Sequence, residues 1–303
     1  MLLACGSNGS GQLGLGDNED RHAFTPVNIA LPGEPQIYGG GNHTLIVSQG
    51  EAFVSGKVGD WNTSVFEKID YKKAGSDASQ IWTCGGSGWA HFFLASNTSL
   101  WVYGTGNRGE LGLGAATCSP LAPLIEFTAP IEHISCGMAH TVVRLANGEL
   151  WGWGSNRHGR LPGLQEKVVS SPCKLPFTAD QAVCGRDFTL LLLNGSVSGF
   201  GRGSFSPTMQ GAKLYCGWSF YGILDREGAL IDWHGNNSHH QLEAPKSIHI
   251  AVGSEHGLAY LANTITSWGW GEHGNCPADH KVPTIPSLYC GCATSFAWHQ
   301  EPI

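Results

Sequence analysis

A short unit built around the pattern Gly-x-x-His recurs along this chain, and this recurrence constrains the fold more than any other feature. In the clearest copy, Ile134 to Gly163, an apolar run from Thr141 to Leu145 is followed by an Asn147-Gly148 turn and a second run, Leu150 to Trp153. Asn-Gly favours the positive φ values of a two-residue hairpin turn. Each unit is therefore predicted to be built on a short antiparallel hairpin.

The spacing of the unit predicts how many hairpins there are. The first glycine of each unit is followed by the next after 32 residues (Gly185 to Gly217) to 49 residues (Gly88 to Gly137). Repeats of about 35 to 50 residues, each with about four short strands, are typical of β-propellers. We therefore predict an all-β fold, a seven-bladed β-propeller of four-stranded blades, with residues 1–303 as a single domain. The first glycines of the seven units are Gly40, Gly88, Gly137, Gly185, Gly217, Gly253 and Gly291.

The two ends of the chain carry complementary halves of one unit. Residues 1–33 begin with a second half, A-C-G-S-N-G-S-G-Q-L-G, and the segment from Tyr289 to His299 reads as a first half, Y-C-G-C-A-T-S-F-A-W-H. Joining them completes a seventh unit and removes the two free sheet edges that an open array exposes. We expect N- and C-terminal strands to share one blade and close the propeller.

Composition limits the classes of partner. The formal net charge is −7 and only 14% of residues are charged, with the densest positive clusters at Lys72-Lys73 and at Arg157 with Arg160. Proteins that bind nucleic acids usually present a basic face, so direct nucleic-acid binding is not expected. No segment approaches the roughly 20 apolar residues of a membrane span, and no export leader precedes the first unit. We expect a soluble cytoplasmic protein without membrane association, and the sequence leaves open whether it also enters the nucleus.

The residues that could carry chemistry follow the repeat instead of departing from it. One histidine per unit at a fixed strand position predicts a packed, hydrogen-bonded framework residue, not a base or metal ligand. The ten cysteines include no C-x-x-C pair. We therefore predict no enzymatic activity, no cofactor and no metal site. The repeated histidines are His43, His91, His140 and His256.

A second glycine-rich motif gives the chain a family resemblance. Gly6 to Gly16, Gly104 to Gly114 and Gly154 to Gly163, together with C-G-x-x-H-T and L-W-x-W-G, resemble the repeat of the regulator of chromosome condensation family. The resemblance covers essentially the whole chain and implies a seven-bladed propeller closed by both termini. Units four and five depart from it, since Phe188 and Phe220 replace the histidine and unit four lacks the Q-L-G-L-G tail.

The two residues between glycine and histidine are where the units differ most. They lie at a strand start, so successive units should bring them to one face of the propeller. Tryptophan, methionine and arginine are enriched in protein-binding hot spots, so this face is a candidate partner-binding site. Equally open is that Trp89 and Trp218 only cover blade edges. The candidate residues are Trp89, Met138, Arg186, Asp187, Trp218 and Glu255.

The resemblance also implies a function. The motif Gly6 to Gly16, followed by the acidic Asp17, Glu19 and Asp20, is similar to that of the small fungal branch of alpha-tubulin suppressors, also known from killer-toxin insensitivity. That branch implies a non-enzymatic propeller that forms a heterodimer with a small CSL-type zinc-finger protein. It supports diphthamide synthesis and Elongator-dependent modification of the wobble uridine in transfer RNA, which makes the Elongator complex a second expected partner. The alternative is the founding activity of the family, guanine-nucleotide exchange on a Ran-like GTPase.

Overall fold

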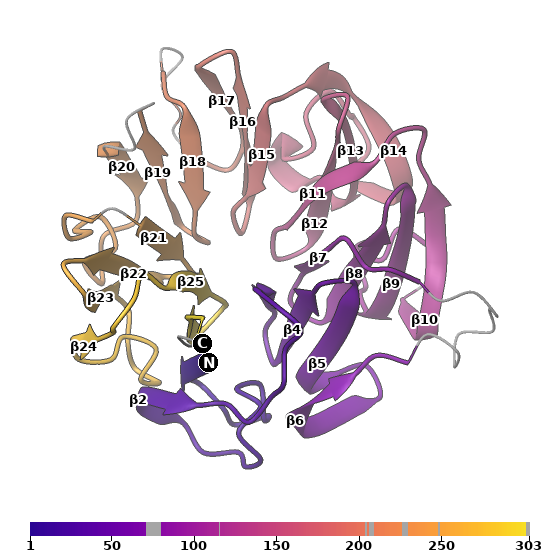
Figure 1. The fold of residues 1–303 in the computed structure, drawn as a ribbon. Helices are drawn as coiled ribbons and strands as arrows, with labels where there is room; N and C mark the ends of the chain where they lie inside the picture. Colours follow the sequence, from indigo (N-terminus) through magenta and orange to yellow (C-terminus); the bar gives the residue numbers. More distant parts are fainter. Residues whose placement is uncertain are drawn as a thin grey trace. The chain divides into compact units, whose positions relative to one another are not determined.

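The strands form seven antiparallel sheets, the blades of a seven-bladed β-propeller as predicted (Figure 1). The computed structural model describes residues 1–70, 80–114, 116–203, 205, 209–225, 230–247 and 249–300, so Lys72 and Lys73 lie outside it. Within these ranges five sheets have four strands and two have three. None of the described segments forms a helix long and apolar enough to cross a bilayer.

The first compact unit comprises Met1–Ile69 and Asn236–Ile303 and holds three blades. Their strands are β1 (Leu2–Gly6), β2 (Arg21–Pro26), β3 (Gln36–Gly39), β4 (His43–Ser48), β5 (Glu51–Val58), β6 (Trp61–Lys68), β21 (His249–Val252), β22 (His256–Leu261), β23 (Thr264–Gly269), β24 (His280–Lys281), β25 (Ser287–Cys290) and β26 (Thr294–Trp298).

One blade of this unit is assembled from both ends of the chain. Its strand order is β2-β1-β26-β25, with Leu2 opposite Trp298 and Gly6 opposite Thr294. The terminal amine of Met1 donates to the carbonyl oxygen of His299 at 2.6 Å, and the two termini lie side by side in Figure 1. The expectation that terminal strands share a blade is confirmed.

The second compact unit, Asp70–Gly235, holds the other four blades. Its two three-stranded sheets, β15-β16-β17 and β18-β19-β20, come from repeat units four and five, the units that depart most from the repeat in sequence. The elements are β7 (Cys84–Ser87), β8 (His91–Ser96), β9 (Ser99–Thr105), β10 (Thr117–Glu126), β11 (Ile131–Cys136), β12 (His140–Leu145), β13 (Glu149–Ser155), the 3₁₀ turn η2 (Arg157–Gly159), β14 (Val168–Thr178), β15 (Gln181–Cys184), β16 (Phe188–Leu193), β17 (Ser196–Gly201), β18 (Lys213–Cys216), β19 (Phe220–Leu224) and β20 (Leu230–Gly235).

Buried tryptophans tie consecutive blades together. Trp153 on β13 is fully buried and packs edge-on against Phe93 of the preceding blade, with ring centroids 5.3 Å apart. Its indole N–H donates to the carbonyl oxygen of Glu110, in the loop after β9, at 2.8 Å. Trp268 in the first unit donates to the carbonyl oxygen of Gln241 in the same way, at 2.9 Å. The L-W-x-W-G motif therefore supplies both apolar packing and the partner of a loop carbonyl.

The repeated histidines are framework residues, as predicted. All four are buried; His140 Nε2 lies 3.0 Å from Thr189 Oγ1 of the next blade, and His256 Nε2 lies 3.0 Å from a serine hydroxyl at the equivalent place. The glycine of Gly-x-x-His makes room for the ring, because a Cβ on Gly137 would lie 2.3 Å from His140 Cε1. The pattern is therefore a packing requirement.

Burial of these imidazoles predicts acid sensitivity. Burial lowers the pKa of His91 and of His256 to about 4, and that of His140 to about 3, from an ordinary value of 6.5. The unfolded chain binds more protons between these values, so the free energy of unfolding should fall as pH drops from 6.5 towards 4. The loss is at most about 1.4 kcal/mol per pH unit for each histidine.

Urea unfolding at pH 7, 6 and 5 measures this dependence. His91→Phe is the matched variant, because the chain itself places Phe188 and Phe220 at this position. It should fold and show a shallower pH dependence. A free energy of unfolding that stays constant between pH 7 and pH 5 would contradict neutral buried histidines.

Candidate functional site

Two tryptophans from distant repeats, the exposed Trp89 and the partly buried Trp218, meet in the second unit. Trp89 precedes β8 and Trp218 precedes β19, with two whole blades between them in the chain, yet their ring centroids lie 5.4 Å apart. Trp89 is 43% exposed. The pair therefore forms an aromatic platform open to solvent. The other interpretation that the sequence left open was that these tryptophans only cover blade edges. Their contact joins two blades and so goes beyond the covering of a single edge.

Arg186 and Asp187 lie beside this platform. The backbone N–H of Arg186 donates to the carbonyl oxygen of Trp218 at 2.9 Å, and Arg186 Nε lies 3.7 Å from Asp187 Oδ2. The other carboxylate oxygen of Asp187 pairs with the buried Arg160 at 2.9 Å. Asp187 thus lies between two guanidinium groups next to the tryptophans, whereas the Arg186 side chain is 54% exposed.

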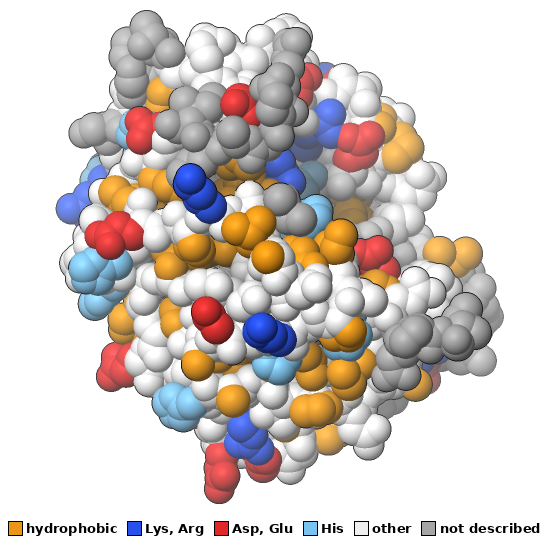
Figure 2. All heavy atoms as spheres, turned by 60° about the vertical axis from the view of Figure 1, so that its left-hand side comes forward, with side chains coloured by type: hydrophobic (Ala, Val, Ile, Leu, Met, Phe, Trp, Pro, Cys, Tyr) orange, Lys and Arg blue, Asp and Glu red, His pale blue; other side chains and the backbone are white. Residues whose placement is uncertain are grey.

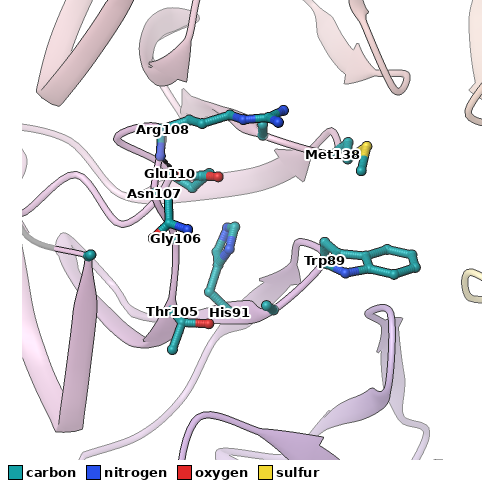
Figure 3. A pocket seen from close by; sticks show the side chains of 11 residues that line it. Trp89, His91, Thr105, Gly106, Asn107, Arg108, Glu110 and Met138 are labelled. Carbon is teal, nitrogen blue, oxygen red and sulfur yellow. Dashed lines mark hydrogen bonds between the residues drawn. The ribbon is translucent and has the colours of Figure 1, made fainter.

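Met138 and Trp89 line the same pocket, which has a volume of about 400 Å³ (Figure 3). His91 and Glu110 line the interior and are buried, whereas Arg108 is exposed. The low pKa of His91, caused by its burial, keeps the imidazole neutral at physiological pH. The pocket thus combines apolar side chains with a neutral imidazole and a carboxylate. We call Trp89, Met138, Arg186, Asp187 and Trp218, with this pocket, the recognition face.

Glu255, the sixth predicted residue, belongs to the first unit. It precedes β22, and its carboxylate accepts a hydrogen bond from Gln241 Nε2 at 2.8 Å. The second unit therefore contains five of the six predicted residues. Glu255 lies in the first unit, where it takes part in a contact between two loops.

Arginines gather at the recognition face more than the sequence indicated. Burial lowers the pKa of Arg160, Asp187 raises it, and the nearby Arg108 and Arg157 lower it further. Arg186 is the fourth arginine of this region, which also contains Asp187 and Glu110. On the face of the molecule shown in Figure 2, Lys and Arg side chains are interspersed with Asp and Glu side chains. The region is locally basic in a chain whose formal net charge is −7.

Glu110 and Arg160 are the site residues that sequence reasoning missed. Both occupy the position before leucine in the glycine-rich loop motif, where two other units have glutamine, Gln12 and Gln241. A change from glutamine to a charged residue at an otherwise regular position was the available signal. Its meaning depends on the partner side chain in the next blade, which repeat spacing alone does not identify.

Buried cysteines of this chain are held in the thiol form. Burial raises the pKa of Cys184 and of Cys276 to about 11, so these thiols stay protonated at neutral pH. A thiolate is the nucleophilic and metal-binding form. Among the residues that the structure describes, no group of three or more His, Cys, Asp or Glu side chains is arranged to hold a metal ion.

Comparison with family models identifies the repeat. Two models, both described as the regulator of chromosome condensation (RCC1) repeat, match residues 1–47 and 147–192 in one case and 131–160 in the other. Residues 1–47 and 131–192 of this chain thus match the RCC1 repeat. It is 28% identical to the RCC1 repeat-containing protein C10F6.04 of Schizosaccharomyces pombe, an alignment covering 93% of this chain and 90% of that protein.

Two further relatives are longer chains. The ultraviolet-B receptor UVR8 of Arabidopsis thaliana is 29% identical over 90% of this chain. A secretion-regulating guanine nucleotide exchange factor of Bos taurus is 27% identical over all of it. This chain spans 62% and 61% of their respective lengths.

Solved structures support the fold. Prp20p of Saccharomyces cerevisiae, which binds Gsp1p and histones, superimposes with a TM-score of 0.79 over 98% of this chain and 90% of its own, at 15% identity. Human WBSCR16 gives 0.78 over 99% of this chain and 100% of its own, also at 15% identity. At this level of identity the likeness concerns the propeller fold alone.

The contrast between exposed and buried tryptophans can be tested by substitution. Replacing Trp89 and Trp218 together by alanine should lower the free energy of unfolding by about 1 kcal/mol or less, because surface side chains contribute little. Trp153→Ala, the control, removes a buried ring and its hydrogen bond and should cost about 3–5 kcal/mol. Equilibrium denaturation measures both. A double variant as unstable as Trp153→Ala would place the platform in the core.

Proposed function

We propose that this chain is a non-enzymatic protein-binding propeller whose recognition face docks a partner protein. The observation that carries the proposal is the contact of the exposed Trp89 with the partly buried Trp218 beside Arg186. Tryptophan and arginine are the side chains most enriched in binding hot spots. An aromatic pair built from separate blades is also rigid, so little conformational entropy is lost when a partner covers it.

The partner that we propose is a small CSL-type zinc-finger protein, bound as a heterodimer. This choice follows from the likeness of the Gly6 to Gly16 segment to the small fungal propellers of this family. The fungal relative that matches nearly the whole chain is in keeping with it. In this role the chain would support diphthamide synthesis and, with Elongator as a further partner, wobble-uridine modification in transfer RNA. We propose that it acts in the cytoplasm, and cell fractionation tests for a nuclear fraction.

Guanine-nucleotide exchange on a Ran-like GTPase is the second candidate. Two similarities favour it: the bovine relative is named as an exchange factor, and Prp20p binds Gsp1p. An exchange factor must bind the nucleotide-free GTPase more tightly than the nucleotide-bound form. This requirement separates the two candidates experimentally.

Co-purification tests the leading proposal. The tagged full-length chain, expressed in fungal cells, should recover a zinc-containing protein in a one-to-one complex, identified by mass spectrometry and metal analysis. The Trp89→Ala, Trp218→Ala double variant should lose at least tenfold of it. Lys57→Glu, an exposed charge change in the first unit, should recover as much as wild type.

Release of fluorescent GDP from a Ran-like GTPase tests the second candidate. Under the leading proposal, the purified chain leaves the release rate unchanged. Acceleration of release, together with recovery of a nucleotide-free GTPase in place of a zinc protein, would refute the leading proposal and support exchange.

A further inference from the structure

A contact between neighbouring blades is repeated at two junctions of this propeller. At each, the side chain before leucine in the glycine-rich loop reaches a carboxylate just before the second strand of the next blade. Arg160 pairs with Asp187 at 2.9 Å, and Gln241 donates to Glu255 at 2.8 Å. The carboxylate in each case accepts from a nitrogen donor of the preceding loop.

The contact is missing at the junction that contains Glu110. The equivalent position in the next blade is Ala139, which has no polar side chain. Glu110 does make the hydrogen bond within its own loop, since its Oε2 accepts the backbone N–H of Arg108. Gln12 and Gln241 accept a backbone N–H of their own loops in the same way. Its other carboxylate oxygen meets no donor among the described residues. The side chain is nonetheless buried, with Glu110 only 8% exposed.

The pocket of about 400 Å³ lies where the missing contact would be, lined by Glu110, Ala139 and His91. His91 is 1% exposed, and its Nε2 has no hydrogen-bond partner in the described structure. Figure 3 shows its ring directed towards the loop that carries Glu110, with Trp89 and Met138 at one side. A buried imidazole nitrogen without a partner is costly, and His91 lines this cavity together with the largely buried Glu110.

We propose that this pocket receives a basic side chain, arginine or lysine, from the bound partner. The inference rests on the proposed protein-binding function and names the chemistry recognised at the recognition face. The cationic group would pair with Glu110 and donate to His91 Nε2, replacing the nitrogen donor that carboxylates receive at the other junctions. Its aliphatic stem would lie against Met138, and its charge beside the indole face of Trp89.

The charges around the pocket favour a cation over an anion. A carboxylate entering it would be buried beside Glu110, and two like charges at such a distance repel strongly in a low-dielectric interior. Arg108 also lines this pocket but is exposed to solvent, and in Figure 3 its side chain passes above Glu110 towards the side of Met138. Water screens its repulsion of an incoming cation. Neutral His91 adds no positive charge.

Titration with N-acetyl-arginine amide tests the proposal on the full-length chain. The indole N–H signal of Trp89, assigned by its loss in Trp89→Ala, should shift saturably at millimolar concentrations of this probe. N-acetyl-citrulline amide, which has the same shape without the charge, should bind at least tenfold more weakly. N-acetyl-glutamate amide should cause no saturable shift.

Glu110→Gln is the matched variant, because glutamine is the native residue at this position in two other units, Gln12 and Gln241. It should fold with an unchanged melting temperature and weaken binding of the arginine probe at least tenfold. No saturable shift with wild type, equal binding of the citrulline probe, or full binding by Glu110→Gln would each overturn the proposal. If the zinc protein still co-purifies when the probe fails, only the pocket assignment falls; if co-purification itself fails, the proposed function falls.

Discussion

The contact on which the rest of this structure depends is the one between successive blades. A sheet of three or four short strands cannot bury both of its faces alone, and within each unit neighbouring blades cover one another. The hydrogen bond from Trp153 to the Glu110 carbonyl and the contact between His140 and Thr189 show how these sheets are joined. Because the same kind of contact recurs, its residues are fixed by packing, and conspicuous types such as histidine and tryptophan need no functional explanation there.

Function is therefore to be sought where the repeat leaves side chains free. The two residues between glycine and histidine lie at a strand start and contribute little to the buried sheet faces. This freedom lets one unit place Trp89 there and another place Arg186, without cost to the blades beneath. The platform formed by Trp89 and Trp218 is a property of the second unit as a whole, since neither blade alone provides both rings.

The sequence was sufficient to predict the blades but not the contacts between loops. Glycine spacing and Asn-Gly turns determine hairpins locally, and the complementary terminal halves could be joined by pattern alone. Contact between Trp89 and Trp218 depends on how four blades are arranged within the unit, which no local pattern encodes. Glu110 was missed for a related reason: only the fold shows that the residue opposite it in the next blade is Ala139, which offers its carboxylate no polar partner.

Charge at the recognition face also has a physical logic that net charge conceals. Asp187 lies between Arg160 and Arg186, so these arginines neutralise its negative charge. The surrounding arginines make the rim of the recognition face basic. Glu110, in contrast, is buried in the pocket without a paired cation among the described residues. A partner fitting both would present acidic groups to the rim and one basic group to the pocket. Such opposed requirements discriminate between partners more sharply than a uniformly charged surface could, because a wrong charge at either place is left desolvated and unpaired.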